Sequence, residues 1–205
     1  MLLIAQALLA PLLMRWWRLT PAEMGIHLNW SALCQGVGWG GLLAVAGAAW
    51  MRHLLQTENS WSTLLFTLPT SADWIFIPAL MPLVEEVLFR GAVFGALLRR
   101  WHPGCAVLLS AGISTVLHPI EPWQLFVFLT AIGYTLAMRW SGSLLAPILA
   151  HCLVNATMLF FRIDPSRCAA LSSTMLLSVT LVSLALIVTT RSLNEARSSV
   201  TTRLE

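Results

Sequence analysis

Long apolar runs make up most of this chain, and charged residues interrupt them only rarely. Hydrophobic residues account for 58% of the 205 positions and charged residues for 10%, with a mean hydropathy of +0.77. A soluble domain carries about 25% charged residues, so this chain has too few to cover a water-facing surface or to form a disordered region or a coiled coil. A β-barrel would instead show alternating segments of about ten residues. We therefore expect an all-α, polytopic integral membrane protein.

Roughly seven segments have the character of membrane-spanning helices, each of which needs about 20 mostly apolar residues. We expect them at about 1–17, 30–51, 74–98, 104–118, 122–138, 143–161 and 168–190. More polar stretches join or follow them: a connector at 20–29, an outer loop at 52–73 and a tail at 191–205. Because no repeat and no soluble module stands out, we expect one helical bundle, a single transmembrane domain over residues 1–205.

The arginines indicate how the bundle is oriented. All 12 basic residues are arginine, against nine acidic residues, and the net charge is +3. If the loops alternate across seven spans, eight of these arginines fall on one side: Arg15, Arg18, Arg99, Arg100, Arg139, Arg191, Arg197 and Arg203. Three fall on the other side: Arg52, Arg162 and Arg167. The positive-inside rule places the larger group in the cytoplasm, so we expect a cytoplasmic C-terminus.

The basic residues also bear on partners and source. They are scattered rather than gathered into a basic stripe, so the lipid bilayer and not nucleic acid is the expected partner. The absence of lysine is typical of GC-rich coding, and we expect a bacterial inner-membrane protein. The four cysteines form no CxxC pair and lie in or beside apolar runs, where free thiols pack like small hydrophobic groups.

The third expected span holds three ionisable residues in an otherwise apolar segment: Glu85, Glu86 and Arg90. Each costs about 2.5–3.5 kcal/mol on insertion scales, and such residues usually face the bundle interior and pair with one another. Glu86 and Arg90 are four residues apart, so they share a helix face and are expected to form an ion pair. Glu85 points about 100° away and needs another partner.

Further polar groups occur in two other spans. His118 ends the fourth span, and His151 and Asn155 project together from the sixth because they are also four residues apart. A carboxylate that converges with two imidazoles and an amide can hydrolyse an amide bond. The carboxylate activates water as a general base, and the imidazole and amide groups stabilise an oxyanion. We expect Glu85 to be that carboxylate.

Three motifs in these spans resemble those of the CPBP family. The segment PLVEEVLFRG, Pro82 to Gly91, is similar to the family's EExxxR motif. The FxxxH motif is matched by Ser114 to His118, with serine where the family usually has phenylalanine, and the HxxxN motif by His151 to Asn155. The family comprises intramembrane proteases, among them type II CAAX prenyl endopeptidases and bacteriocin-processing or self-immunity relatives. The resemblance covers a protease-like core at about 74–161.

The resemblance implies an intramembrane endopeptidase that cleaves a peptide bond in or near the membrane. We expect it to use no metal or other cofactor, because the motifs supply a general base beside a histidine and no metalloprotease helix signature exists. It implies that Glu85 and His118 activate water and that His151 and Asn155 stabilise the oxyanion. Glu86 and Arg90 would order the site. The implied substrate is a membrane-anchored or membrane-associated protein or peptide: a prenylated C-terminus, a bacteriocin leader or the anchor of a sorted protein.

Two alternatives remain open from the sequence. Glu85, His118 and His151 could supply three ligands to a zinc ion with an open fourth position, although no HExxH motif is present. The chain could instead be a non-catalytic scaffold or immunity protein that keeps the fold to bind a partner. A proton-coupled transporter would also use buried Glu and His, but neither inverted repeats nor broken helices are evident in the sequence.

Overall fold

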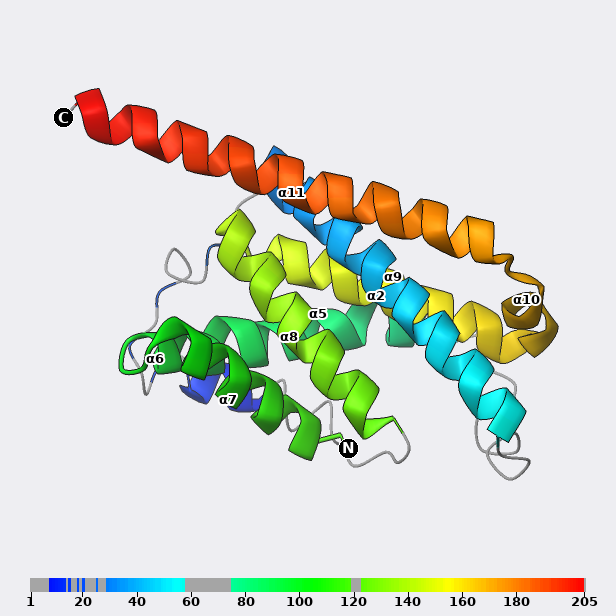
Figure 1. Ribbon diagram of the computed structural model, residues 1–205. Helices are drawn as coiled ribbons and strands as arrows, with labels where there is room; N and C mark the ends of the chain where they lie inside the picture. The colour runs from blue at the N-terminus through cyan, green and yellow to red at the C-terminus, as the bar shows by residue number, and fades with distance from the viewer. Residues whose placement is uncertain are drawn as a thin grey trace.

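The structure, a computed structural model, describes residues 8–13, 15, 18, 20, 25, 29–57, 75–118 and 123–204. Throughout this part of the chain the regular structure is helical, without strands, which confirms the all-α prediction (Figure 1). The elements are α2 (Trp30–Thr57), η1 (Phe76–Leu80), α5 (Met81–Glu86), η2 (Val87–Phe94), α6 (Gly95–Leu98), α7 (Pro103–Val116), α8 (Gln124–Ser141), α9 (Leu145–Ile163), α10 (Pro165–Ala170) and α11 (Ser173–Leu204).

Three of the described helices are long and apolar enough to cross a membrane, judged by length and composition. They lie at Trp30–Leu54, Leu145–Ile163 and Ser173–Glu195, and α7 is apolar but shorter. This is fewer than the seven spans expected. Several expected features lie outside the described residues: all of the first span except 8–13 and 15, most of the 20–29 connector, residues 58–73 of the outer loop, and the residues 119–122 around the start of the fifth span.

The last expected span differs from the prediction, because two helices occupy it. Asp164 caps α10 by accepting a hydrogen bond from the Ser166 amide at 3.1 Å, and the extended Leu171 ends that helix. The hydroxyl of Ser172 then accepts from the Met175 amide at 3.1 Å and starts α11. That helix continues to Leu204 through the expected polar tail, which contains neither glycine nor proline to stop it.

The segment that carries the EExxxR motif is a continuous helical rod interrupted by two π-helical stretches, η1 and η2. Proline lacks a backbone N–H, and both Pro78 and Pro82 lie in this rod, where each removes a helical hydrogen bond. The π-helical turn is wider than the α-helical one and occurs frequently at functional sites. Glu85 and Glu86 end α5, and Arg90 lies in the middle of η2.

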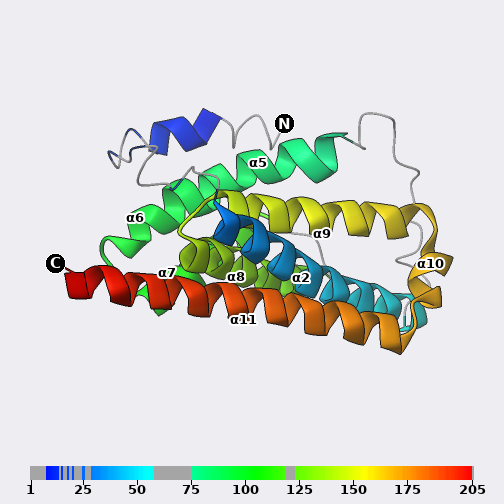
Figure 2. The ribbon, with the colours of Figure 1, turned by 90° about the horizontal axis from the view of Figure 1, so that it is seen from above.

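Helix α2 packs between α9 and α11 (Figures 1 and 2). The GxxxG pair Gly36 and Gly40 faces α9 so closely that an added Cβ would lie 2.8 Å from Leu149 or Leu153 side-chain carbons. On the other face, a Cβ at Gly41 would clash with the Ser183 hydroxyl. Small residues thus let three apolar helices approach each other, which is how helices associate where the hydrophobic effect is weak.

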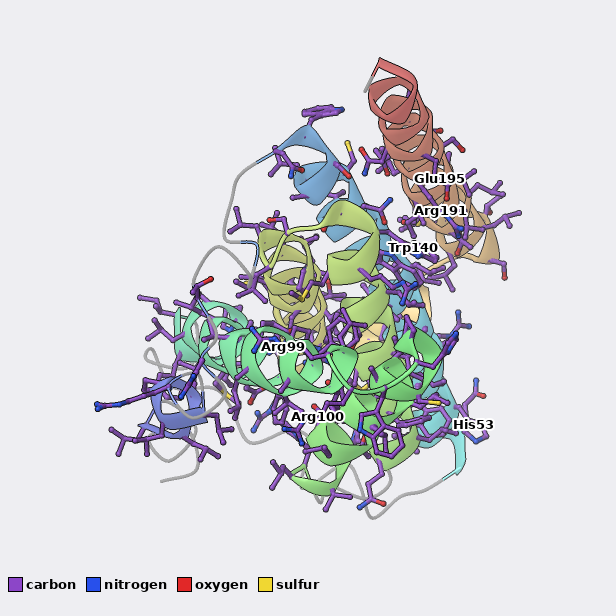
Figure 3. The ribbon with its side chains drawn as sticks, turned by 90° about the vertical axis from the view of Figure 1, so that its left-hand side faces the viewer. His53, Arg99, Arg100, Trp140, Arg191 and Glu195 are labelled. Carbon is purple, nitrogen blue, oxygen red and sulfur yellow. The ribbon has the colours of Figure 1, made fainter. Side chains whose placement is uncertain are left out.

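Side-chain contacts define the two ends of the bundle. Asn194 on α11 donates to the Trp140 carbonyl at 3.1 Å and to the Ser31 hydroxyl at 2.7 Å, which joins α11 to the end of α8 and the start of α2. At the opposite end, Arg52 donates to the Leu171 carbonyl at 3.1 Å. The first end carries Arg99, Arg100 and Arg191 (Figure 3), together with Arg139 in the last turn of α8 and Arg18, which lines the same cavity as Arg99 and Arg100; we call it the arginine-rich end.

Candidate active site

Glu85 lies beside His118, as the sequence predicts. Glu85 is 3% exposed, and its Oε1 lies 3.3 Å from Nε2 of His118. The imidazole is held from its other side, because Nδ1 lies 2.7 Å from the Ser114 carbonyl oxygen. A carbonyl only accepts, so Nδ1 carries a proton, and the contact between Nε2 and Oε1 of Glu85 requires a second proton on one of these two atoms.

The position of His118 follows from the end of α7. This helix begins at Pro103, with the His102 ring accepting from the Gly104 amide at 3.3 Å, and its last residue is Val116. His118 therefore comes two residues after the helix. Because Ser114 holds the imidazole through its backbone carbonyl, the serine that replaces the family's phenylalanine does not remove this contact.

His151 on α9 contacts both glutamates. Its Nδ1 lies 2.7 Å from Oε1 of Glu86, and its Nε2 lies 3.8 Å from Oε2 of Glu85. An ionised carboxylate accepts and does not donate, so Nδ1–H points to Glu86 and Nε2 faces Glu85. The Glu85 carboxylate is thus flanked by the Nε2 atoms of two histidines, His118 just after α7 and His151 on α9. The contact of His151 with Glu86 was not anticipated.

The ion pair between Glu86 and Arg90 forms, as expected from their spacing. Arg90 Nη1 donates to Oε1 of Glu86 at 2.9 Å, and Nη2 donates to the Ala131 carbonyl on α8 at 3.0 Å. Both side chains are buried, Arg90 with 1% exposure. A buried charge is costly unless it is paired and hydrogen-bonded. Here the chain itself supplies a carboxylate and a carbonyl to the guanidinium.

Tyr134 on α8 is a member of the cluster that the sequence did not reveal. Its ring stacks on His151, with centroids 4.7 Å apart and planes 18° apart. The guanidinium carbon of Arg90 lies 5.3 Å from the centroid of the same ring. Tyr134 belongs to none of the three motifs, and no spacing relation links it to His151. Only the packing of α8 against α9 brings them together.

Asn155 also has a specific partner in the structure. Its Nδ2 donates to the Ile77 carbonyl in η1 at 3.0 Å. In η1, the Met81 amide bonds to the Phe76 carbonyl five residues back, so Pro82 is in line for the Ile77 carbonyl but has no N–H. Asn155 therefore supplies the donor that the proline lacks. One of its two amide protons is used in this way.

A cavity of about 430 Å³ adjoins the cluster and is lined by Glu85, His118, His151 and Asn155. The rest of its wall is mainly apolar or aromatic and includes Met51, Met81, Trp123, Phe126 and Met158. Arg162 lies at its border, in the last turn of α9. An apolar hollow with a few converging polar groups is the usual form of a small-molecule or peptide site.

The arrangement bears on each predicted role. Glu85 and His118 contact each other, and a carboxylate beside an imidazole can take a proton from a water molecule. His151 and Asn155 line the same cavity, but the structure also gives each a protein partner. Within the described ranges, no group of three or more His, Cys, Asp or Glu side chains is arranged to hold a metal ion.

Comparisons with known proteins agree with the motifs. Residues 67–157 match the family described as Type II CAAX prenyl endopeptidase Rce1-like, which confirms the resemblance over that segment. The protein named "Putative membrane peptidase YdiL" of Bacillus subtilis (strain 168) is 30% identical over 88 residues, which are 42% of this chain and 35% of that protein.

A second protein of the same organism, "Uncharacterized protein YpbD", is 28% identical over 119 residues, which are 56% of this chain and 59% of that protein. The chain thus spans less than two thirds of the length of either relative. No solved structure matches the chain.

Proposed function

We propose that this chain is an intramembrane endopeptidase that hydrolyses a peptide bond with water activated by Glu85. The observation that carries the proposal is the buried Glu85 carboxylate between the Nε2 atoms of His118 and His151, on the wall of an apolar cavity. The family match over residues 67–157 supports a protease of the CAAX type. The finer glutamate-dependent mechanism is inferred from the geometry of the cluster.

In the proposed reaction, Glu85 accepts a proton from a water molecule held against His118. The hydroxide attacks the scissile carbonyl carbon, and the carbonyl oxygen becomes an oxyanion in a tetrahedral intermediate. The C–N bond then breaks, and the departing amine receives the proton from Glu85. Water supplies the new carboxyl oxygen and both protons of the products, so no covalent enzyme intermediate, metal or other cofactor enters the scheme.

We assign the oxyanion side of the site to His151 and Asn155. With Nδ1–H directed to Glu86, His151 donates to an oxyanion through Nε2 when that nitrogen also carries a proton. Asn155 has a second N–H besides the one that bonds to Ile77. Glu86, Arg90 and Tyr134 then act as positioning residues, because they fix His151 from two sides.

The cavity indicates the class of substrate and where it enters. Its wall is mainly apolar, which suits a membrane-anchored or membrane-associated peptide segment. The lining residues Ile77, Trp123 and Arg162 lie at the start of the EExxxR rod, the start of α8 and the end of α9, all away from the arginine-rich end. We place the chain in a bacterial inner membrane as a polytopic bundle of about seven spans with a cytoplasmic C-terminus. The arginine-rich end then faces the cytoplasm, and the opposite end, where the cavity opens, faces outward.

Thiol labelling tests the direction of the cavity. Ser114 lines it, so Ser114→Cys in a background without the native cysteines places one thiol there. We expect a membrane-impermeant reagent to label this thiol in intact cells. Labelling seen only after the cytoplasm is opened contradicts the outward orientation.

Terminal-peptide mass spectrometry tests the proposed activity without a known substrate. Membranes from host cells that express the chain, or an empty vector, are compared for new peptide termini. We expect termini that appear only with the chain and that lie in or beside membrane anchors or lipidated ends. Equal sets of termini in the two membranes would favour the non-catalytic scaffold instead.

A further inference from the structure

A second cavity, of about 620 Å³, lies at the arginine-rich end of the bundle, away from the candidate active site. It is bordered by the last turns of the EExxxR rod and by α7. The guanidinium-bearing residues Arg18, Arg99 and Arg100 line it. Figure 3 views the molecule from this end and labels Arg99 and Arg100. We call this cavity the arginine groove.

The charge of the arginine groove is of one sign. Its three arginines come from two parts of the chain, the N-terminal segment and the end of α6, and no acidic side chain of the described residues lines it. Guanidinium groups bind phosphate through paired N–H donors in a planar fork. Arg18 and Arg100 are both exposed, so their donors are accessible from outside the protein.

The remaining wall of the arginine groove is apolar. Val93, Leu97 and Ile113 line it, and Val93 lies seven residues before Arg100, or about 10 Å along a helix. Arg99 and Arg100 therefore lie at one end of this apolar wall. Trp101, 54% exposed, stands beside them, and exposed tryptophan is typical of the membrane–water interface.

We propose that the arginine groove binds an anionic phospholipid, with its phosphate on the arginines and the first methylene groups of an acyl chain along Val93, Leu97 and Ile113. The positive charge of the arginines is complementary to the phosphate. The apolar wall beside them suits the acyl chain that follows the headgroup in such a lipid. Basic pockets between helices on the cytoplasmic side are typical lipid-headgroup sites. This inference is independent of the proposed protease activity.

Native mass spectrometry of the purified full-length chain tests the inference. The delipidated protein is mixed with phosphatidylglycerol or with phosphatidylcholine of the same acyl chains. We expect phosphatidylglycerol to bind at least tenfold more tightly and to raise the thermal unfolding temperature, with both effects weaker at high salt because exposed charges are screened. Equal binding of the two lipids, or binding of phosphatidylglycerol that salt does not weaken, overturns the proposal.

Variants locate the lipid on the groove. Arg18→Gln with Arg100→Gln should abolish the preference for phosphatidylglycerol. The matched control is Arg191→Gln, because Arg191 lies at the same end but outside the groove, bonded to Glu195 at 2.8 Å and over the Trp140 ring (Figure 3). A double variant that keeps the preference, or a control that loses it equally, overturns the assignment.

Inorganic phosphate distinguishes a lipid site from a free-phosphate site. If phosphate alone at millimolar concentration raises the unfolding temperature as much as phosphatidylglycerol does, the apolar wall contributes nothing and the lipid assignment is wrong. We expect phosphate to have a smaller effect than the lipid. The salt dependence measured on the unmodified chain keeps the test valid even if the double variant fails to fold.

Discussion

Arg90 lies within the EExxxR rod and Arg100 lies ten positions later, just after the rod ends. The first is buried inside the bundle, and the second is exposed at its surface. Arg90 is 1% exposed, bonded to Glu86 and the Ala131 carbonyl and flanked by the Phe89 and Tyr134 rings. Arg100 is exposed on the rim of a groove. The interior of the bundle must compensate a charge with its own groups, whereas its end can take compensation from water or lipid.

This contrast explains how the candidate site is organised. Compensation of Arg90 requires Glu86, and Glu86 in turn accepts the Nδ1–H of His151. The carboxylate of Glu86, which compensates the buried charge of Arg90, thus also orients the His151 imidazole toward Glu85. The network is not fully satisfied, because Oε2 of Glu86 and Nε of Arg90 are buried without a hydrogen-bond partner. The following predictions test the difference between the inner cluster and the outer arginines.

The largest difference in stability is expected between the Arg90 and Arg100 substitutions. Arg90→Ala leaves Glu86 buried without its cation, and one-sided loss of a buried pair costs about 3–5 kcal/mol. Arg100→Ala should change stability by no more than about 0.5 kcal/mol, as for other surface substitutions. Thermal unfolding in one detergent compares them. Equal destabilisation by the two substitutions contradicts the proposed difference.

The next effect concerns Asn155. As an oxyanion donor, its loss in Asn155→Ala should lower kcat by about 10²–10³. The hydrogen bond to Ile77 is lost as well, at about 1 kcal/mol of stability. Rate and unfolding temperature are measured together on the same preparation. A large loss of stability with a normal rate for the remaining folded protein shows that Asn155 only ties α9 to η1.

Tyr134 should have a smaller effect, through His151. Stacked aromatic pairs contribute about 0.5–1.5 kcal/mol, so Tyr134→Leu should lower kcat by up to about tenfold with little change in KM. Tyr134→Phe keeps the ring and should restore most of the rate. If Phe and Leu are equally impaired, the hydroxyl and not the stacking matters. If KM rises instead, Tyr134 contacts the substrate.

Removal of metal should have the smallest effect. We expect the purified protein to keep its activity after treatment with a chelator, because the proposed base is a free carboxylate. Elemental analysis is the control for residual metal. Stoichiometric zinc, with activity that chelation removes and zinc restores, supports the zinc alternative built on Glu85, His118 and His151.

The sequence predicted the local relations in the site better than the tertiary ones. Spacing of four residues is enough to place Glu86 and Arg90 on one face, since it depends on helix geometry alone. The contact of His151 with Glu86 depends on how α9 packs against α5, and the stacking of Tyr134 depends on α8. Neither follows from the periodicity of a single helix.

Helix boundaries show the same division. The apolar runs predicted most helices, but the run at 168–190 hid the break between α10 and α11, because Asp164 and Ser172 cap helices within an apolar context. The bond from Asn155 to Ile77 could be recognised only afterwards. Asn155 donates to the carbonyl that Pro82 leaves without an N–H donor. Only the fold shows that α9 supplies this donor.

The rate of Glu85→Gln tests the proposed role of Glu85 most directly. The probe is a synthetic peptide that spans a cleavage site found by terminal-peptide mass spectrometry, incubated with the purified chain. Glu195→Gln is the matched control, because Glu195 is exposed on α11. We expect Glu85→Gln to lower the rate by about 10²–10⁴ while its unfolding temperature stays close to that of the unmodified chain. A rate within a few-fold of the unmodified chain would contradict the assignment of Glu85 as the group that activates water.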